Sequence, residues 1–117
     1  MIIALALAAA LAPSAAAADI GPEPTMDAFI ALAEPALLSQ TKKPRPVAFL
    51  WPYRLAAVET GYFTCGRVDP KSARGEDIWV SAVIAGGKVV SAQWSTKNGM
   101  LAWDCKNQVK KGVIPPR

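Results

Sequence analysis

Residues 61–105 read GYFTCGRVDPKSARGEDIWVSAVIAGGKVVSAQWSTKNGMLAWDC, and this stretch decides the fold that we predict. It contains the only two cysteines, Cys65 and Cys105, and three of the four tryptophans. Near its centre, two segments rich in β-branched and aromatic residues flank Gly86-Gly87. A two-residue Gly-Gly connection suits a type I′ turn, which needs a positive φ at both positions. We therefore predict an antiparallel hairpin of residues 77–84 and 88–95.

The two glycines also fix a predicted register for this hairpin. If they form the whole loop, Ala85 opposes Lys88, and the other pairs follow by counting along both strands: Val83 with Val90, Ser81 with Ala92, and Trp79 with Trp94. Opposed aromatic rings stabilise a hairpin by about 0.5–1 kcal/mol. Both predicted faces are partly apolar, so we expect an N-terminal helix to cover one face and the Phe49–Trp51 region to cover part of the other.

That helix is predicted over Met26–Gln40, where apolar residues recur at helical spacing. Thr25 precedes it as a suitable N-cap, and Asp27 in the first turn complements the helix dipole. Pro35 interrupts the pattern, because proline costs about 3 kcal/mol inside a helix but is tolerated in a first turn. We expect either a kink at Pro35 or two short helices that meet there.

The predicted fold class is α+β: an N-terminal helix, kinked or split at Pro35, packed on a small antiparallel sheet of three or four strands and stapled by one disulfide. Residues 62–68 form a third strand, which Asp69-Pro70 ends. Residues 47–51 fit either a strand or a turn of helix. We expect residues 100–105 to run along or across the sheet, and residues 19–24 and 106–117 to be flexible ends.

Residues 1–18 are predicted to be an export signal. An apolar run is followed by Pro13 and by the small residues Ala16-Ala17-Ala18, as at a signal-peptidase site. The run is too short to span a bilayer, which takes about 20 residues, although an uncleaved membrane anchor is the alternative. Residues 19–117 then form a single small domain that is periplasmic or secreted and does not span the membrane.

Cys65 and Cys105 are an even pair in a chain predicted to be exported, where disulfides persist. We predict that they are bonded, with two buried free thiols as the alternative. Closing this loop stabilises the fold by about 4 kcal/mol on the chain-entropy estimate. A redox centre is not expected, because such sites usually place two cysteines in a C-x-x-C motif.

The sequence offers few groups for catalysis, so we predict that the protein is not an enzyme and needs no cofactor or metal. It has no histidine, which removes Ser-His and Cys-His nucleophile pairs and most zinc sites. Ser39-Gln-Thr-Lys42 matches S-x-x-K in letters only, without the companion motifs of that enzyme class. The acidic loop 69–77 includes Lys71 and Arg74, which would repel calcium.

The remaining indications are charge and tryptophan. The net charge of +4 permits weak attraction to an anionic cell-wall polymer, lipid or acidic protein, and is too small to indicate a nucleic-acid partner. Buried tryptophan is the common case, and Trp51 is our choice if one ring is exposed. The candidate contact residues are Trp51, Tyr53, Arg54, Lys42, Lys43 and Arg45.

These observations favour a small exported, non-catalytic accessory or binding domain of the bacterial cell envelope. One alternative is a module that binds glycan or peptidoglycan through surface tryptophan and basic residues. Another is a protein inhibitor of an envelope hydrolase, for which a rigid disulfide-stapled loop is suitable. The partner would be an envelope protein or an anionic cell-wall polymer.

Overall fold

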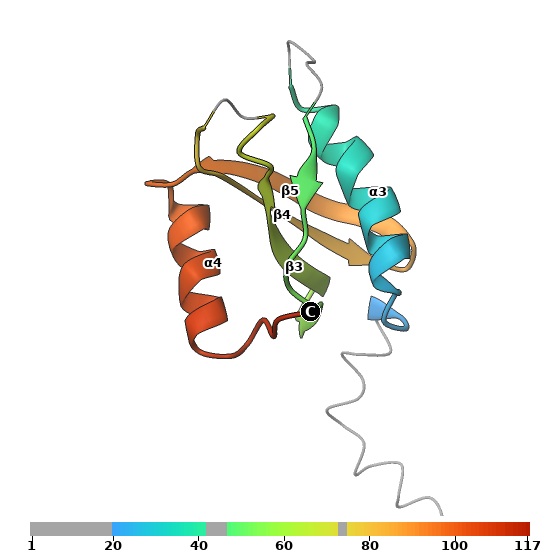
Figure 1. Cartoon of the computed structure of the whole chain (residues 1–117). Helices are drawn as coiled ribbons and strands as arrows, with labels where there is room; N and C mark the ends of the chain where they lie inside the picture. The colour runs from blue at the N-terminus through green and yellow to red at the C-terminus, as the bar shows by residue number, and fades with distance from the viewer. Residues whose placement is uncertain (1–19, 42–46, 73–74) are drawn as a thin grey trace, which may run out of the picture.

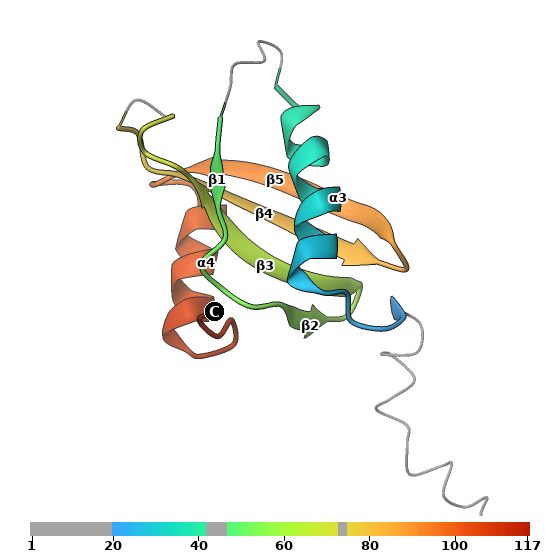
Figure 2. The ribbon, with the colours of Figure 1, turned by 45° about the vertical axis from the view of Figure 1, so that its right-hand side comes forward.

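A computed structural model of the chain describes residues 20–41, 47–72 and 75–117. The predicted signal segment lies outside the described residues, as do Lys42, Lys43 and Arg45. In the described chain, two helices pack on opposite faces of one antiparallel sheet (Figures 1 and 2). The α+β class is confirmed, while the number of helices and the size of the sheet differ from our prediction.

The sheet has five strands, all paired antiparallel. Their bounds are β1 Phe49–Leu50, β2 Ala56–Val58, β3 Gly61–Val68, β4 Ile78–Ala85 and β5 Lys88–Thr96. The order is β1-β3-β4-β5, and β2 pairs with the other end of β3. The region 47–58 therefore supplies two short strands to one edge of the sheet. For residues 47–51, our prediction had allowed either a strand or a turn of helix.

Helix α3, Met26–Leu38, begins as predicted and continues through Pro35 as one helix. The Thr25 side chain accepts a hydrogen bond from the Ala28 N–H at 3.1 Å, which satisfies one of the free donors of the first turn. The two-helix alternative is thus wrong. The helix buries one stripe against the sheet, formed by Phe29, Ala33 and Leu37.

The turn between β4 and β5 confirms the predicted hairpin. Gly86 and Gly87 have φ values of 57° and 74°, and Ala85 pairs with Lys88. The register then shifts by one, because Ile84 pairs with Val89 but Val83 pairs with Ser91. Val90 is the extra residue of this β-bulge. The predicted pairs beyond it are wrong: the structure has Val83–Ser91, Ser81–Gln93, Val80–Trp94 and Trp79–Ser95.

The bulge determines which face each tryptophan occupies, because one inserted residue reverses the alternation of the side chains that follow it. Trp94 lies on the α3 side, where its Nε1 donates to the Leu37 carbonyl at 2.9 Å and its ring lies 5.6 Å from that of Phe49. Trp79 lies on the other side, in a separate cluster with Ala102 and Cys105. The predicted Trp79–Trp94 pair therefore does not form.

Helix α4, Met100–Lys110, covers the second face of the sheet and was not predicted as a helix. It carries Cys105, whose disulfide to Cys65 is confirmed, with Cα atoms 6.1 Å apart. We had assigned the Phe49–Trp51 region to this face. That assignment is wrong, since Phe49 and Trp51 pack in the cluster on the α3 side.

The C-terminal residues are held to the domain, although we expected residues 106–117 to be flexible. Residues 106–110 complete α4, and Ile114 is fully buried against the cluster that contains the disulfide. The Arg54 N–H donates to the Pro115 carbonyl at 2.7 Å, and the Arg117 N–H donates to the Pro52 carbonyl at 3.0 Å. These bonds tie the segment after α4 to the segment between β1 and β2.

Candidate binding surface

The four tryptophans differ in exposure, and this locates the candidate surface. Trp51 and Trp79 are 7% and 5% exposed, Trp94 is half-buried, and Trp103 is 61% exposed. We expected tryptophans to be buried in general, which holds for Trp51, but our choice of Trp51 as the ring to be exposed, if any was, is wrong. The exposed ring belongs to α4, the helix that we did not predict.

Trp51 is part of the core. Its Nε1 donates to a carboxylate oxygen of Glu34 in α3 at 2.9 Å, and its ring meets Phe29 edge-on with centroids 5.7 Å apart. Gly66 lies directly beneath it, because a Cβ there would approach the Trp51 ring to 2.6 Å. The ring thus joins α3 to β3.

Of the other predicted contact residues, the structure describes Tyr53 and Arg54, and neither lies in the α4 helix that carries the exposed ring. Tyr53 is half-buried and forms an isolated β-bridge with Pro116. Arg54 is exposed and lines a shallow hollow of about 360 Å³ together with Glu23 and Arg117. The structure therefore places Tyr53 and Arg54 beside the C-terminal segment.

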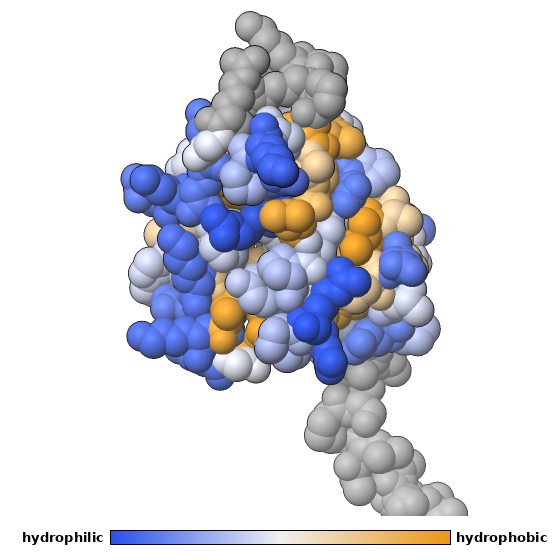
Figure 3. Space-filling model, viewed as in Figure 1, coloured by the Kyte–Doolittle hydropathy of each residue, from blue (hydrophilic) through white to orange (hydrophobic). Residues whose placement is uncertain are grey.

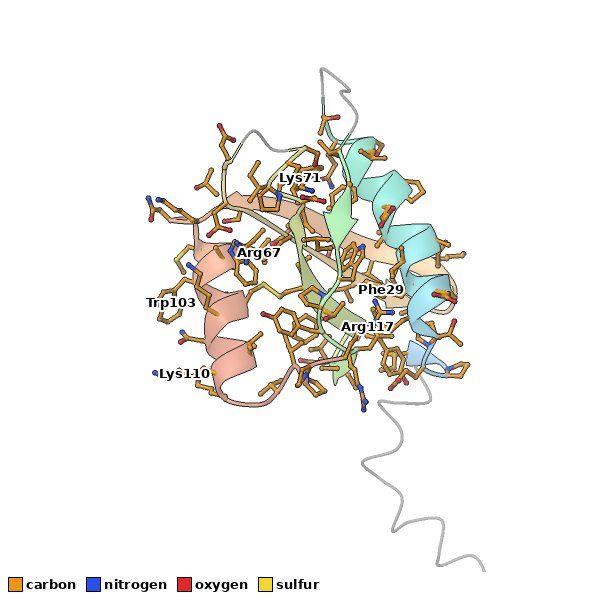
Figure 4. All side chains as sticks on the ribbon, in the orientation of Figure 1. Phe29, Arg67, Lys71, Trp103, Lys110 and Arg117 are labelled. Carbon is orange, nitrogen blue, oxygen red and sulfur yellow. A yellow bond between two sulfur atoms is a disulfide. The ribbon has the colours of Figure 1, made fainter. Side chains whose placement is uncertain are left out.

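One flank of α4 combines Trp103 with two cations. Trp103, Lys106 and Lys110 are exposed and follow one another at spacings of three and four residues, which places them on one side of the helix. Figure 4 shows Trp103 and Lys110 on the outer side of α4. The surface over α4, at the left of Figure 3, is mostly hydrophilic. We call Arg67, Trp103, Lys106 and Lys110 the α4 basic flank.

Arg67 joins this flank from β3 through Trp79. The Arg67 guanidinium carbon lies 5.2 Å from the centre of the Trp79 ring, and the Lys106 Nζ lies 5.9 Å from the same ring. Both distances are within the range of cation–π attraction. Arg67 also forms a part-exposed ion pair with Asp77 at 2.6 Å. The buried Nε atoms of Arg67 and Trp79 have no hydrogen-bond partner.

Two of the three carboxylates of the acidic loop, Asp69 and Asp77, are engaged within the protein. Asp77 pairs with Arg67, and an oxygen of Asp69 accepts from the Lys71 N–H at 3.0 Å. A hollow of about 490 Å³ lies beside this loop, where Glu76 and Asp77 face Thr96 and Lys97. The carboxylates of Asp69 and Asp77 therefore already have partners, in the loop backbone and in the ion pair.

Within the described ranges, no group of three or more His, Cys, Asp or Glu side chains is placed to hold a metal ion. No helix in that part of the chain is long and apolar enough to cross a membrane. The disulfide is consistent with an oxidising periplasmic or extracellular location. No family model, no curated protein and no solved structure matches the chain.

Proposed function

We propose that this protein is a non-catalytic binding domain of the bacterial cell envelope that attaches to an anionic glycan polymer through the α4 basic flank. The observation that carries the proposal is Trp103, a large ring that is 61% exposed on a folded helix. Exposed tryptophan supplies a large, rigid contact area and is enriched where proteins bind partners. Its neighbours on the flank are cationic.

Charge favours an anionic partner. Lys106 and Lys110 have no carboxylate partner among the ion pairs of the described residues, and only Arg67 is paired, with Asp77. Each exposed cation attracts an anion weakly, and salt screens this attraction. A polymer presents many anionic groups to the same flank, so weak contacts act together through a high effective concentration.

The disulfide holds this flank in place before a ligand binds. Cys105 in α4 is bonded to Cys65 in β3, and both cysteines are 1% exposed. Binding to a helix that is already fixed loses less conformational entropy than binding to a mobile segment. The bond also supports the exported location that the proposal needs, because disulfides persist mainly outside the cytosol.

A sedimentation assay with purified cell walls, with and without their anionic polymers, tests the proposal. We expect Trp103→Ala to weaken binding about tenfold, as the loss of one buried aromatic contact implies. Lys110→Ser should weaken binding less, and added salt should weaken it further. Lys88→Ser removes the same charge at the hairpin turn and serves as the matched control. Unchanged binding of the Trp103→Ala variant would overturn the proposal.

A further inference from the structure

The other flank of α4 borders a cleft of about 230 Å³ that opens between the helix and the sheet. Phe63 of β3 and Ser81 of β4 line it from the sheet. Leu101, Asp104 and Gln108 line it from the helix, where their spacings of three and four residues place them on one side. Trp103, Lys106 and Lys110 do not line this cleft, so it is separate from the α4 basic flank.

The disulfide fixes the width of the cleft. Cys65 on the sheet and Cys105 on the helix both line it, and they are bonded to each other. The helix side and the sheet side of the cleft are thus joined by a covalent bond that itself lines the cleft. A cleft held in this way is formed before a ligand arrives, which is usual for small-molecule sites.

Three polar side chains at the cleft are available to a ligand. Among the hydrogen bonds of the described residues, none uses the side chain of Ser81, Asp104 or Gln108. Ser81 is only 8% exposed and lines the cleft from the sheet. The half-buried Phe63 and Leu101 add apolar surface beside them.

The size and chemistry of the lining select a class of ligand. The volume is below the roughly 300–1,000 Å³ of sites for drug-sized molecules, so the cleft suits a single small ring. Among the described residues that line it, Asp104 is the only ionisable side chain, which disfavours an anion. A hydroxyl, an amide and a carboxylate beside an aromatic ring match a ligand with several hydroxyl groups and an apolar face.

We propose that this cleft binds one neutral sugar ring, with Asp104 and Gln108 hydrogen-bonded to its hydroxyl groups, Ser81 at the floor and Phe63 against its apolar face. The inference does not depend on the proposed function, because the two sites occupy different flanks of α4. A protein that binds no cell-wall polymer could still bind the sugar. Likewise, a protein that binds no sugar in the cleft could still bind the cell-wall polymer.

The test is an NMR titration of the oxidised protein with glucose and with N-acetylglucosamine. We expect saturable shifts of the backbone amides of Phe63, Ser81 and Gln108. Asp104→Ala and Gln108→Ala should each weaken binding by about fivefold or more, the effect of losing a hydrogen bond to a ligand. Lys88→Ser lies at the hairpin turn, outside the lining of the cleft, and should bind the sugar as the unchanged protein does.

Three results would overturn this proposal. One is the absence of any saturable shift up to about 50 mM sugar. A site with a dissociation constant in the millimolar range would be largely filled at that concentration. Another is equal binding by Asp104→Ala, Gln108→Ala and the unchanged protein. The third is binding of glucosamine, a cation, without binding of either neutral sugar, since that would make the cleft a cation site formed by Asp104.

Discussion

Replacement of Trp94 by alanine tests how much the position of this ring on the α3 side of the sheet contributes to stability. The β-bulge at Val90 places Trp94 opposite Val80, on the face that α3 covers. Without the Trp94 ring, the cluster that it shares with Phe49 and α3 loses these apolar contacts. The hydrogen bond from its Nε1 to the Leu37 carbonyl is lost as well.

The expected loss of stability can be estimated from these contacts. A tryptophan buries 150–250 Å² when fully enclosed, and Trp94 is half-buried, so about 100 Å² of apolar surface returns to water. At about 25 cal/mol per Å² this amounts to about 2.5 kcal/mol. The lost hydrogen bond adds about 1 kcal/mol. We expect Trp94→Ala to lower the free energy of unfolding by about 3–4 kcal/mol, a large part of the 5–15 kcal/mol typical of a domain.

Urea unfolding followed by tryptophan fluorescence measures this change. Val90→Ala is the matched control, because Val90 is 51% exposed and its side chain should contribute less than about 0.5 kcal/mol. Hydrogen exchange at the Trp94 indole of the unchanged protein provides a second measurement, and the hydrogen bond to the Leu37 carbonyl should protect it. A loss below about 1 kcal/mol, together with an unprotected indole, would refute the role that we assign to Trp94.

Three further predictions concern single contacts and can be measured by the same unfolding experiment. Replacing Cys65 and Cys105 by alanine should cost about 4 kcal/mol for a loop of 40 residues, and a loss below about 1 kcal/mol would contradict the chain-entropy argument. Glu34→Ala should cost about 1–3 kcal/mol, because the Trp51 indole N–H loses its acceptor, whereas Glu34→Gln keeps an acceptor and should cost less. Thr25→Ala should cost about 1 kcal/mol through loss of the N-cap, and Thr25→Ser, which keeps the hydroxyl, should be close to neutral.

The hairpin shows how far local sequence signals reach. The Gly86-Gly87 turn was predicted correctly, because both positions need a positive φ that glycine adopts without strain. The bulge was not predicted, because Val90 is an ordinary strand residue with no local mark of an insertion. The position of the bulge depends on which side chains must be buried, because the bulge places Ala92 and Trp94 on the α3 side. That requirement becomes visible only when both faces of the sheet are known.

Helix α4 was missed for a related reason. Only Ala102 and Cys105 are buried in it, so the sequence carries no broad apolar stripe of the kind that predicts a helix. Its N-cap is Gly99, whose lack of a side chain leaves no capping bond to recognise. The candidate surface could not be predicted without this helix. The number of tryptophans did indicate that an aromatic surface was worth seeking, although we chose Trp51 over Trp103.

The way in which α4 is attached explains why it can carry two different surfaces. Helix α3 is held by a broad apolar contact that includes Phe29 and Leu37, whereas α4 is held by Cys105, Ala102 and the buried Ile114 beyond its end. A covalent bond thus replaces much of the apolar burial that would otherwise be needed to hold a helix of 11 residues. Both flanks of α4 are therefore free to carry polar, charged and exposed aromatic side chains.

This arrangement predicts the order in which the two faces loosen on reduction. With the Cys65–Cys105 bond reduced, α4 should lose its hydrogen-exchange protection at reductant concentrations that leave α3 and the β4–β5 hairpin protected. The small apolar contact of α4 cannot by itself offset the entropy of ordering the helix. Simultaneous loss of protection in α3 and α4 would contradict this account, because it would show that the α4 side is no weaker than the α3 side without its covalent link.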